Sequence, residues 1–344
     1  MSERVILGIE TSCDETAAAV IRGGREVLSS VVASQEAVHA RFGGIVPEIA
    51  SRKHAEAITA VVDEALREAD AGWDNIDGIA VTHGPGLVGS LLVGVSAAKG
   101  YALAGGLPLA GINHLEGHLL ANFLQWRDTE PIEPQFPLVC LVASGGHSDI
   151  LLMTDFGEYK ILGWTRDDAA GEALDKGARV LGLPYPGGPA LDATAKAGNP
   201  SAIAFPRPTI SGSFDFSFSG LKTALVRQIE AQGPPRDEKG LADFAASYQE
   251  AVVDTLVRNT TAAAKRYRAR QMLLAGGVAA NSRLRAKIAE AGRKLNLPTH
   301  YPPLSLCTDN AAMIAAAGHY RLERRGPDPL DIDVFSSMPV AEHV

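Results

Sequence analysis

The chain has 344 residues, of which 46% are hydrophobic and 21% are charged, so it is long enough to form two domains with separate cores. Its formal net charge of −8 excludes a strongly basic nucleic-acid-binding protein, and the basic run Arg266–Arg270 is typical of a solvated helix face. Cys13, Cys140 and Cys307 form no CxxC pair, and the N-terminus lacks a secretory signal. These features favour a globular cytoplasmic protein.

The first half of the chain predicts a hairpin followed by alternating helices and strands. The predicted elements are strands at Val5–Glu10 and Thr16–Ile21, a helix at Pro47–Ala69, a strand at Ile76–Thr82 and a helix at Gly89–Ala104. The apolar stretch Gly86–Ile112 contains Lys99 and many glycines, so we interpret it as a packed helix with flanking strands and not as a membrane span.

A pair of histidines, His114 and His118, follows this stretch. Positions i and i+4 lie on one face of a helix, so both imidazoles can reach one cation. Asn113 is a good N-cap, and Glu116 has the spacing of a capping box. Glu116 points away from the histidines, which disfavours the general base of a metallopeptidase. The alternative is two histidines without a metal.

The second half repeats the plan of the first. After the proline-rich linker Thr129–Pro137, the predicted elements are strands at Leu138–Ala143 and Ser148–Met153, a helix at Asp168–Leu181, an alternating strand at Phe214–Phe218, further helices up to about Arg270 and a strand at Gln271–Ala275. Strands that alternate with helices predict an α/β protein, and two duplicated halves predict a ligand cleft between them.

Three glycine-rich turns are candidate phosphate cradles, because glycine lets backbone N–H groups approach an anion. They lie at Ser144–His147, Gly187–Gly188 and Gly276–Gly277, and none has the spacing of a Walker or dinucleotide-binding loop. Asn281 follows the third turn at the start of a helix, where it would either contact a nucleoside or cap the helix. Asp192 could equally be a cap.

Near the C-terminus, Ser305–Ile314 introduces an alanine-rich helix. Asp309 or Thr308 would cap this helix, or Asp309 would be a third metal ligand beside the two histidines. Two imidazoles and one carboxylate with open positions suit Fe(II) or catalytic Zn(II), and Cys307 is a weaker alternative ligand.

Seven motifs, taken together and in order, resemble the bacterial TsaD family, the tRNA N6-adenosine threonylcarbamoyltransferases once labelled O-sialoglycoprotein endopeptidases. The resemblance runs from about Val5 to about Gly318, and the motifs are Ile9–Thr16, His114–His118, Ser144–His147, Asp167–Lys176, Tyr185–Pro189, Phe216–Thr223 and Ala275–Asn281. It implies an actin/hexokinase-like (ASKHA) fold with one subdomain at residues 1–130 and 309–344 and a second at residues 131–308.

The resemblance also implies the reaction and its site. Threonylcarbamoyl-AMP would donate its threonylcarbamoyl group to N6 of adenosine 37 in tRNAs that read ANN codons. His114, His118 and Asp309 would hold one ion, Fe(II) or else Zn(II). The adenylate would contact Val142, Ala143, Ser144, Gly145, Gly146, Asp175, Gly188, Asp192 and Asn281. No residue is identified as the general base, for which Glu10, His83 and His147 are candidates.

The family usually works with a TsaB-like paralogue and a TsaE-like ATPase, and the helix at Gly89–Ala104 is our predicted partner face. The alternatives are an ATP-dependent kinase or ATPase of the same fold, a metallopeptidase, and a partner protein without catalytic activity. Neither the kinase nor the non-catalytic protein requires the metal.

Overall fold

The computed structural model describes residues 3–127 and 131–341. It divides into two compact units, each of which we describe by itself. Of the described residues, unit 1 comprises 3–127, 131–134, 156–158 and 302–341, and unit 2 comprises 135–155 and 159–301. The predicted linker begins at Thr129 and the predicted subdomain boundary follows Glu130, both outside the described residues.

Unit 1 contains a five-stranded sheet in the order β3-β2-β1-β4-β5. Its strands are β1 (Val5–Glu10), β2 (Glu15–Arg22), β3 (Glu26–Ser34), β4 (Gly78–Gly84) and β5 (Leu109–Asn113). Its helices are α1 (Glu36–His39), α2 (Pro47–Glu68), α3 (Val88–Gly105), α4 (His114–Leu120) and α10 (Ala311–Arg325). β1 pairs antiparallel with β2 and parallel with β4, so the predicted first hairpin is confirmed.

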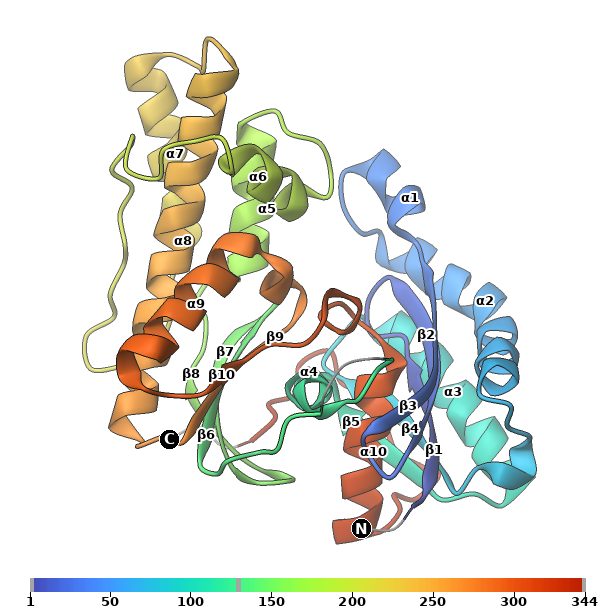
Figure 1. The fold of residues 1–344 in the computed structure, drawn as a ribbon. Helices are drawn as coiled ribbons and strands as arrows, with labels where there is room; N and C mark the ends of the chain where they lie inside the picture. Colours follow the sequence, from blue (N-terminus) through green and yellow to red (C-terminus); the bar gives the residue numbers. More distant parts are fainter. Residues whose placement is uncertain (1–2, 128–130, 342–344) are drawn as a thin grey trace. The chain divides into compact units, whose positions relative to one another are not determined.

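The two faces of this sheet are covered by different helices, α2 and α3 on one side and α10 on the other (Figure 1). Alternate residues of a strand point to opposite faces. In β1, Leu7 and Ile9 belong to the core with α2 and α3, whereas Gly8 faces α10 and leaves room for its backbone. Glu10 has the same parity as Gly8 and therefore belongs to the α10 face.

Helix α3 is, by length and composition alone, the one helix in the described ranges that could cross a membrane, and 33% of it is buried inside the structure. Its buried residues include Leu91, Gly94 and Ala98. A Cβ atom at Gly94 would lie 2.3 Å from Thr11 Oγ1, so α3 packs closely against the end of β1. The predicted helix is confirmed, and its buried side packs against β1.

Unit 2 repeats the arrangement with a sheet in the order β10-β9-β6-β7-β8. Its strands are β6 (Leu138–Ala143), β7 (Ser148–Asp155), β8 (Glu158–Gly163), β9 (Gln271–Ala275) and β10 (Thr299–His300). Its helices are α5 (Ala170–Val180), α6 (Gly187–Ala195), α7 (Ser219–Gln232), α8 (Glu238–Arg266) and α9 (Ser282–Leu295). As in unit 1, the first strand of the hairpin pairs antiparallel with the second (β6 with β7) and parallel with a later strand (β9).

One predicted strand, Phe214–Phe218, is wrong. The segment makes only an isolated bridge, between Thr165 and Phe216. Asp215 instead accepts hydrogen bonds from Trp164 N (3.2 Å) and Arg166 Nε (2.6 Å), and Ser217 Oγ donates to Asp167 (2.6 Å). These polar contacts hold the segment as a loop, although its alternating phenylalanines are typical of a strand.

Candidate metal centre and donor site

The two histidines of the predicted metal site lie on the short helix α4, which begins at His114 directly after β5. Asn113 is the N-cap, and its Oδ1 accepts a hydrogen bond from Leu115 N at 2.9 Å, so this predicted cap is confirmed. Since the rings are one helical turn apart, they lie close together, with centroids separated by 4.5 Å.

Asp309 reaches the same point from the segment before α10. The N-cap of α10 is Asn310, whose side chain accepts a hydrogen bond from Met313 N at 3.0 Å, so the alternative of Asp309 or Thr308 as the cap is wrong. Asp309 Oδ1 lies 3.1 Å from His118 Nε2 and 3.5 Å from His114 Nε2. One ligand atom from each of the three residues lies within 4.8 Å of the others.

His118 is fully buried, and neither of its ring nitrogens has a hydrogen-bond partner among the described residues. The 3.1 Å approach of Nε2 to Asp309 lacks the geometry of a hydrogen bond. Burial, together with the charge on His114, lowers the pKa of His118. A buried neutral imidazole without a partner is unfavourable by itself and is the form in which histidine binds a metal.

His114 has different surroundings, because its Nδ1 lies 3.0 Å from Glu10 Oε2 and 3.2 Å from Ser12 Oγ. Burial disfavours the charged ring, but the carboxylates of Asp309 and Glu10 raise the pKa of His114 well above its ordinary value. Conversely, despite their burial, His114 holds the pKa of Asp309 and of Glu10 below the ordinary range. The cluster of Glu10, His114 and Asp309 is therefore stabilised by a positive charge.

The negative charge of the cluster also affects neighbouring titratable groups. Burial and the negative charges of Asp309 and Asp14 raise the pKa of Glu15, and the same effects raise the pKa of the Cys13 thiol. Cys307 Sγ donates instead to the carbonyls of Pro302 and Pro303, and it is not in the cluster.

The donor set fits a divalent transition metal. Two donors bound at 2.0–2.2 Å to a tetrahedral ion are about 3.4 Å apart. The separations between Asp309 and the two Nε2 atoms, 3.1 and 3.5 Å, are close to this value. Two imidazoles and one carboxylate leave open positions for a substrate, and the Asp309 side chain retains 20% of its exposure.

The first glycine turn, in unit 2, presents open backbone. Ser144 N donates to His147 O (2.8 Å) and closes the turn between β6 and β7, whereas Val142 and Ala143 are fully buried in β6. A Cβ atom at Gly145 or Gly146 would meet nothing within 4 Å. The N–H groups of these two glycines donate to none of the described residues, so they remain available to an anion.

The predicted donor residues of unit 2 form a chain of direct contacts. A Cβ atom at Gly276 would lie 2.4 Å from Ala143 O, which brings the third glycine turn against the first. Gly171 N, in the first turn of α5, donates to Ser144 O at 3.1 Å. On the next turn of α5, Asp175 Oδ1 accepts a hydrogen bond from Gly188 N at 2.7 Å, which joins the second glycine turn to α5.

The chain of contacts continues into α9. Asp192, on α6, accepts hydrogen bonds from Ser282 N (3.2 Å) and Ser282 Oγ (2.9 Å). Asn281 is the N-cap of α9, since its Oδ1 accepts from Leu284 N at 2.9 Å, and its Nδ2 donates to Gln249 at 2.8 Å. The structure thus brings together all the predicted donor residues, while a nucleoside contact by Asn281 stays a prediction.

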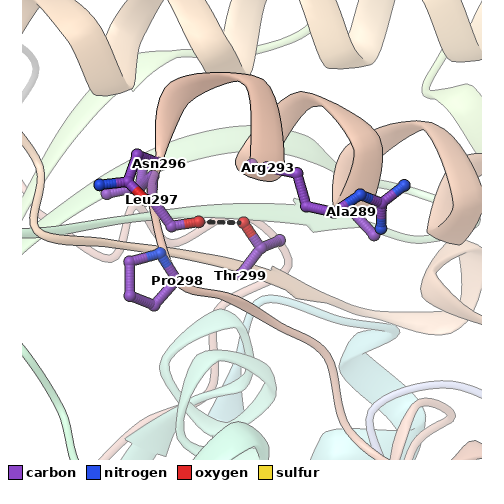
Figure 2. A pocket seen from close by; sticks show the side chains of 7 residues that line it. Ala289, Arg293, Asn296, Leu297, Pro298 and Thr299 are labelled. Carbon is purple, nitrogen blue, oxygen red and sulfur yellow. Dashed lines mark hydrogen bonds between the residues drawn. The ribbon is translucent and has the colours of Figure 1, made fainter.

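Two of the cavities formed by the described residues are lined by unit 2. One of about 290 Å³ adjoins the donor residues and is lined in part by Lys196, Gln249, Ser282 and Arg283, which the sequence did not single out. Figure 2 shows the other, of about 550 Å³, at the end of α9 and the turn into β10, where Thr299 Oγ1 donates to Leu297 O. It contains none of the predicted site residues.

Sequence comparisons agree with the motifs. A family model described as TsaD, tRNA N6-adenosine threonylcarbamoyltransferase, matches residues 26–316. The chain belongs to the TsaD family. A relative of that name from Anaeromyxobacter dehalogenans is 56% identical over 328 residues, covering 94% of this chain and 96% of the relative. Another, from Clostridium botulinum, is 51% identical and covers 98% of both chains.

Solved structures identify the fold. HypF from T. kodakarensis matches with a TM-score of 0.63 and 15% identity, over 94% of this chain and 48% of its own. Component A of (R)-2-hydroxyglutaryl-CoA dehydratase from Acidaminococcus fermentans matches with a TM-score of 0.51 and 14% identity, over 92% and 98% of the two chains. At such identities the likeness concerns the fold alone. The chain has the ASKHA fold, as the family resemblance implies, and the repeated hairpin agrees with it.

Proposed function

We propose that the chain transfers the threonylcarbamoyl group of threonylcarbamoyl-AMP to N6 of adenosine 37 in tRNAs that read ANN codons. The observation that carries this proposal is the 51–56% identity, over 93–98% of the chain, to relatives named tRNA N6-adenosine threonylcarbamoyltransferase. In the reaction, N6 forms a bond to the carbamoyl carbon, the bond from that carbon to the phosphate oxygen breaks, N6 loses a proton, and AMP leaves.

Unit 2 binds the donor in this proposal. The free N–H groups of Gly145 and Gly146 contact the phosphate, which gains negative charge as the mixed anhydride breaks. Asp175 and Asp192 do not act on the reacting atoms. Their hydrogen bonds to Gly188 and Ser282 hold the helices α6 and α9 in place around the nucleotide. Such fixed donors stabilise charge without reorganising during the reaction.

Unit 1 binds the metal. His118 and His114 contribute Nε2, and Asp309 contributes a carboxylate oxygen. We propose Fe(II), with Zn(II) as the alternative, because both ions accept two imidazoles and one carboxylate. When bound, the ion supplies Lewis-acid polarisation and orientation of oxygen ligands. The buried, uncharged ring of His118 and the anionic Asp309 are already in the forms that bind a cation.

Helix α3 is our proposed face for a TsaB-like paralogue, with a TsaE-like ATPase as a further partner. Val88, Leu92 and Leu103 are 44%, 47% and 72% exposed on this helix, so three large apolar side chains of one helix contact water. Burial of such a face in a complex would remove this apolar surface from water. With tRNA as substrate, we expect the complex in the cytoplasm.

The test is reconstitution with synthetic threonylcarbamoyl-AMP, tRNA and the partner proteins. Nucleoside mass spectrometry should detect threonylcarbamoyladenosine, and AMP should be released in equal amount. An adenosine 37 to guanosine substitution in the tRNA is the matched control. If no modified nucleoside forms while the donor and tRNA are intact, the proposal is wrong. Elemental analysis of freshly purified protein tests the metal independently.

A further inference from the structure

The carboxylate of Glu10 lies at the end of β1, within the interior of unit 1. Its exposed fraction is 0%, and its position in the strand turns it to the face on which α10 packs. A fully buried carboxylate is costly unless hydrogen-bond donors surround it. Glu10 was one candidate for the general base, so its partners decide whether it could accept a proton from a substrate.

Both oxygens of Glu10 are already engaged. Oε1 accepts a hydrogen bond from Ser12 N at 2.5 Å, and Oε2 accepts one from Thr82 Oγ1 at 2.5 Å. His114 Nδ1 lies 3.0 Å from the same Oε2. A fully buried carboxylate with these three contacts is better placed to hold a neighbouring side chain than to accept a proton from the exocyclic amine of adenosine.

We propose that Glu10 is a positioning residue, whose carboxylate accepts the Nδ1–H of His114 and thereby directs His114 Nε2 toward the metal. This inference rests on the proposed metal binding by His114, His118 and Asp309. Histidines that bind metals commonly donate their other N–H to a carboxylate or carbonyl, which determines the tautomer and the ring orientation.

The residues that donate hydrogen bonds to Glu10 come from different structural elements. Ser12 lies in the turn after β1, and Thr82 lies in β4, which pairs parallel with β1. Because the Thr82 hydroxyl and His114 share Oε2, removal of the hydroxyl frees that oxygen to rotate away from the ring. His118 has no such support among the described residues, since its Nδ1 lacks a hydrogen-bond partner. At Nδ1, His114 is therefore oriented by Glu10 and by the Ser12 hydroxyl at 3.2 Å, and Glu10 is the shorter and the charged contact.

The test compares Glu10→Gln and Thr82→Val with two matched controls in the full-length chain. Asp215→Asn removes the charge of another buried carboxylate, in unit 2, and Thr16→Val removes a buried hydroxyl that contacts His54 at 2.8 Å. Metal-free protein is titrated with Co(II) in competition with a chelator, and the visible spectrum of bound Co(II) is recorded. Urea unfolding of each metal-free variant measures its stability.

We expect Glu10→Gln to bind Co(II) about 10- to 100-fold more weakly, the range seen when the hydrogen-bond partner of a ligating histidine is removed. The Co(II) spectrum should also change, which loss of stability alone would not produce. Thr82→Val should show a smaller loss of affinity, and both controls should bind as the unaltered chain does.

Tight Co(II) binding with an unchanged spectrum in Glu10→Gln would overturn the inference while the proposed metal site stands. An equal loss in Asp215→Asn would overturn it too, because it would reduce the effect to general destabilisation. If the unaltered chain bound none of Co(II), Fe(II) and Zn(II), the proposed metal site would be wrong. The proposed role of Glu10, which rests on that site, would then be wrong as well.

Discussion

Gly8 offers a direct test of how the metal-binding segment is placed. It lies in the middle of β1, and its backbone conformation is one that alanine also adopts. A Cβ atom at this position would lie 2.2 Å from Ala311 O and 2.9 Å from Ala315 Cβ, both on α10. The substitution Gly8→Ala therefore opposes only the close approach of α10 to the strand.

The expected cost follows from these distances. Ordinary contact begins at 3.4 Å, so Ala311 O would have to move by 3.4 − 2.2, or 1.2 Å. The clashing atom is backbone and cannot rotate away, and α10 is buried from Ala311 to Tyr320. Overpacking of a well-packed core costs about 1–3 kcal/mol, and we expect Gly8→Ala to lie at the upper end of that range.

The same displacement would disturb the metal centre, because Ala311 follows Asp309 by two residues. Metal–ligand distances tolerate only about 0.2 Å of error, so a shift of this size at the start of α10 should weaken metal binding about tenfold or more. Urea unfolding and Co(II) competition titration measure the two effects separately.

Gly44→Ala is the matched control, since a Cβ atom there would meet nothing within 4 Å and its φ is not positive. It should change the free energy of unfolding by less than about 0.5 kcal/mol and leave metal affinity unaltered. If Gly8→Ala were as stable as Gly44→Ala, the close packing of β1 on α10 would be refuted, and with it the derived placement of Asp309.

Three other predictions concern separate parts of the molecule. Burial raises the pKa of Asp149 from 3.8 to about 7, so the folded chain retains a proton that the unfolded chain releases, and stability should fall as the pH rises through this window. Asp149→Asn should therefore be more stable than the unaltered chain above pH 8, by up to about 4 kcal/mol. Urea unfolding of both chains at pH 5 and pH 8.5 measures this difference. An equal change in the free energy of unfolding of the two chains between these pH values would contradict the prediction. In Gly145→Val the new side chain has space but covers the free N–H groups of the turn. AMP should therefore bind about tenfold more weakly in a calorimetric titration, while the free energy of unfolding stays unchanged. An unchanged affinity for AMP would show that Gly145 is not part of the donor site. Leu92→Glu, at a position that is 47% exposed, should leave the isolated chain folded and abolish co-elution with a TsaB-like partner, whereas retained co-elution would exclude this face.

Local patterns predicted much of the fold. The strand predicted at Val5–Glu10 has the bounds of β1, and the helix predicted at Pro47–Ala69 differs from α2 by one residue. These elements follow from hydrophobic periodicity, which acts between near neighbours in the chain. The spacing of His114 and His118 likewise placed both rings on one helical face, and the observed ring separation agrees.

The prediction failed where distant polar groups compete with a local pattern. The phenylalanines of Phe214–Phe218 alternate as in a strand, yet the backbone N–H of Phe218 donates to Asp167, 51 residues away, at 2.7 Å. The sequence left Asp309 either as a helix cap or as the predicted third metal ligand; the cap is Asn310, and Asp309 lies beside the histidines. In each case a contact from another segment of the chain decided the local arrangement.

The sequence by itself determined the α/β class, the repeated hairpin, the histidine pair and, through its motifs, the TsaD family. Only the tertiary structure decided how these parts meet. Asp309 is 191 residues from His118, and the hydrogen bonds of Glu10 join residues that are 72 and 104 positions away. Periodicity carries no information about such separations. The approach of Asp309 to His118 depends on the packing of α10 on β1, where Gly8 leaves room for the helix backbone, and the contact of Glu10 with Thr82 depends on the parallel pairing of β1 with β4.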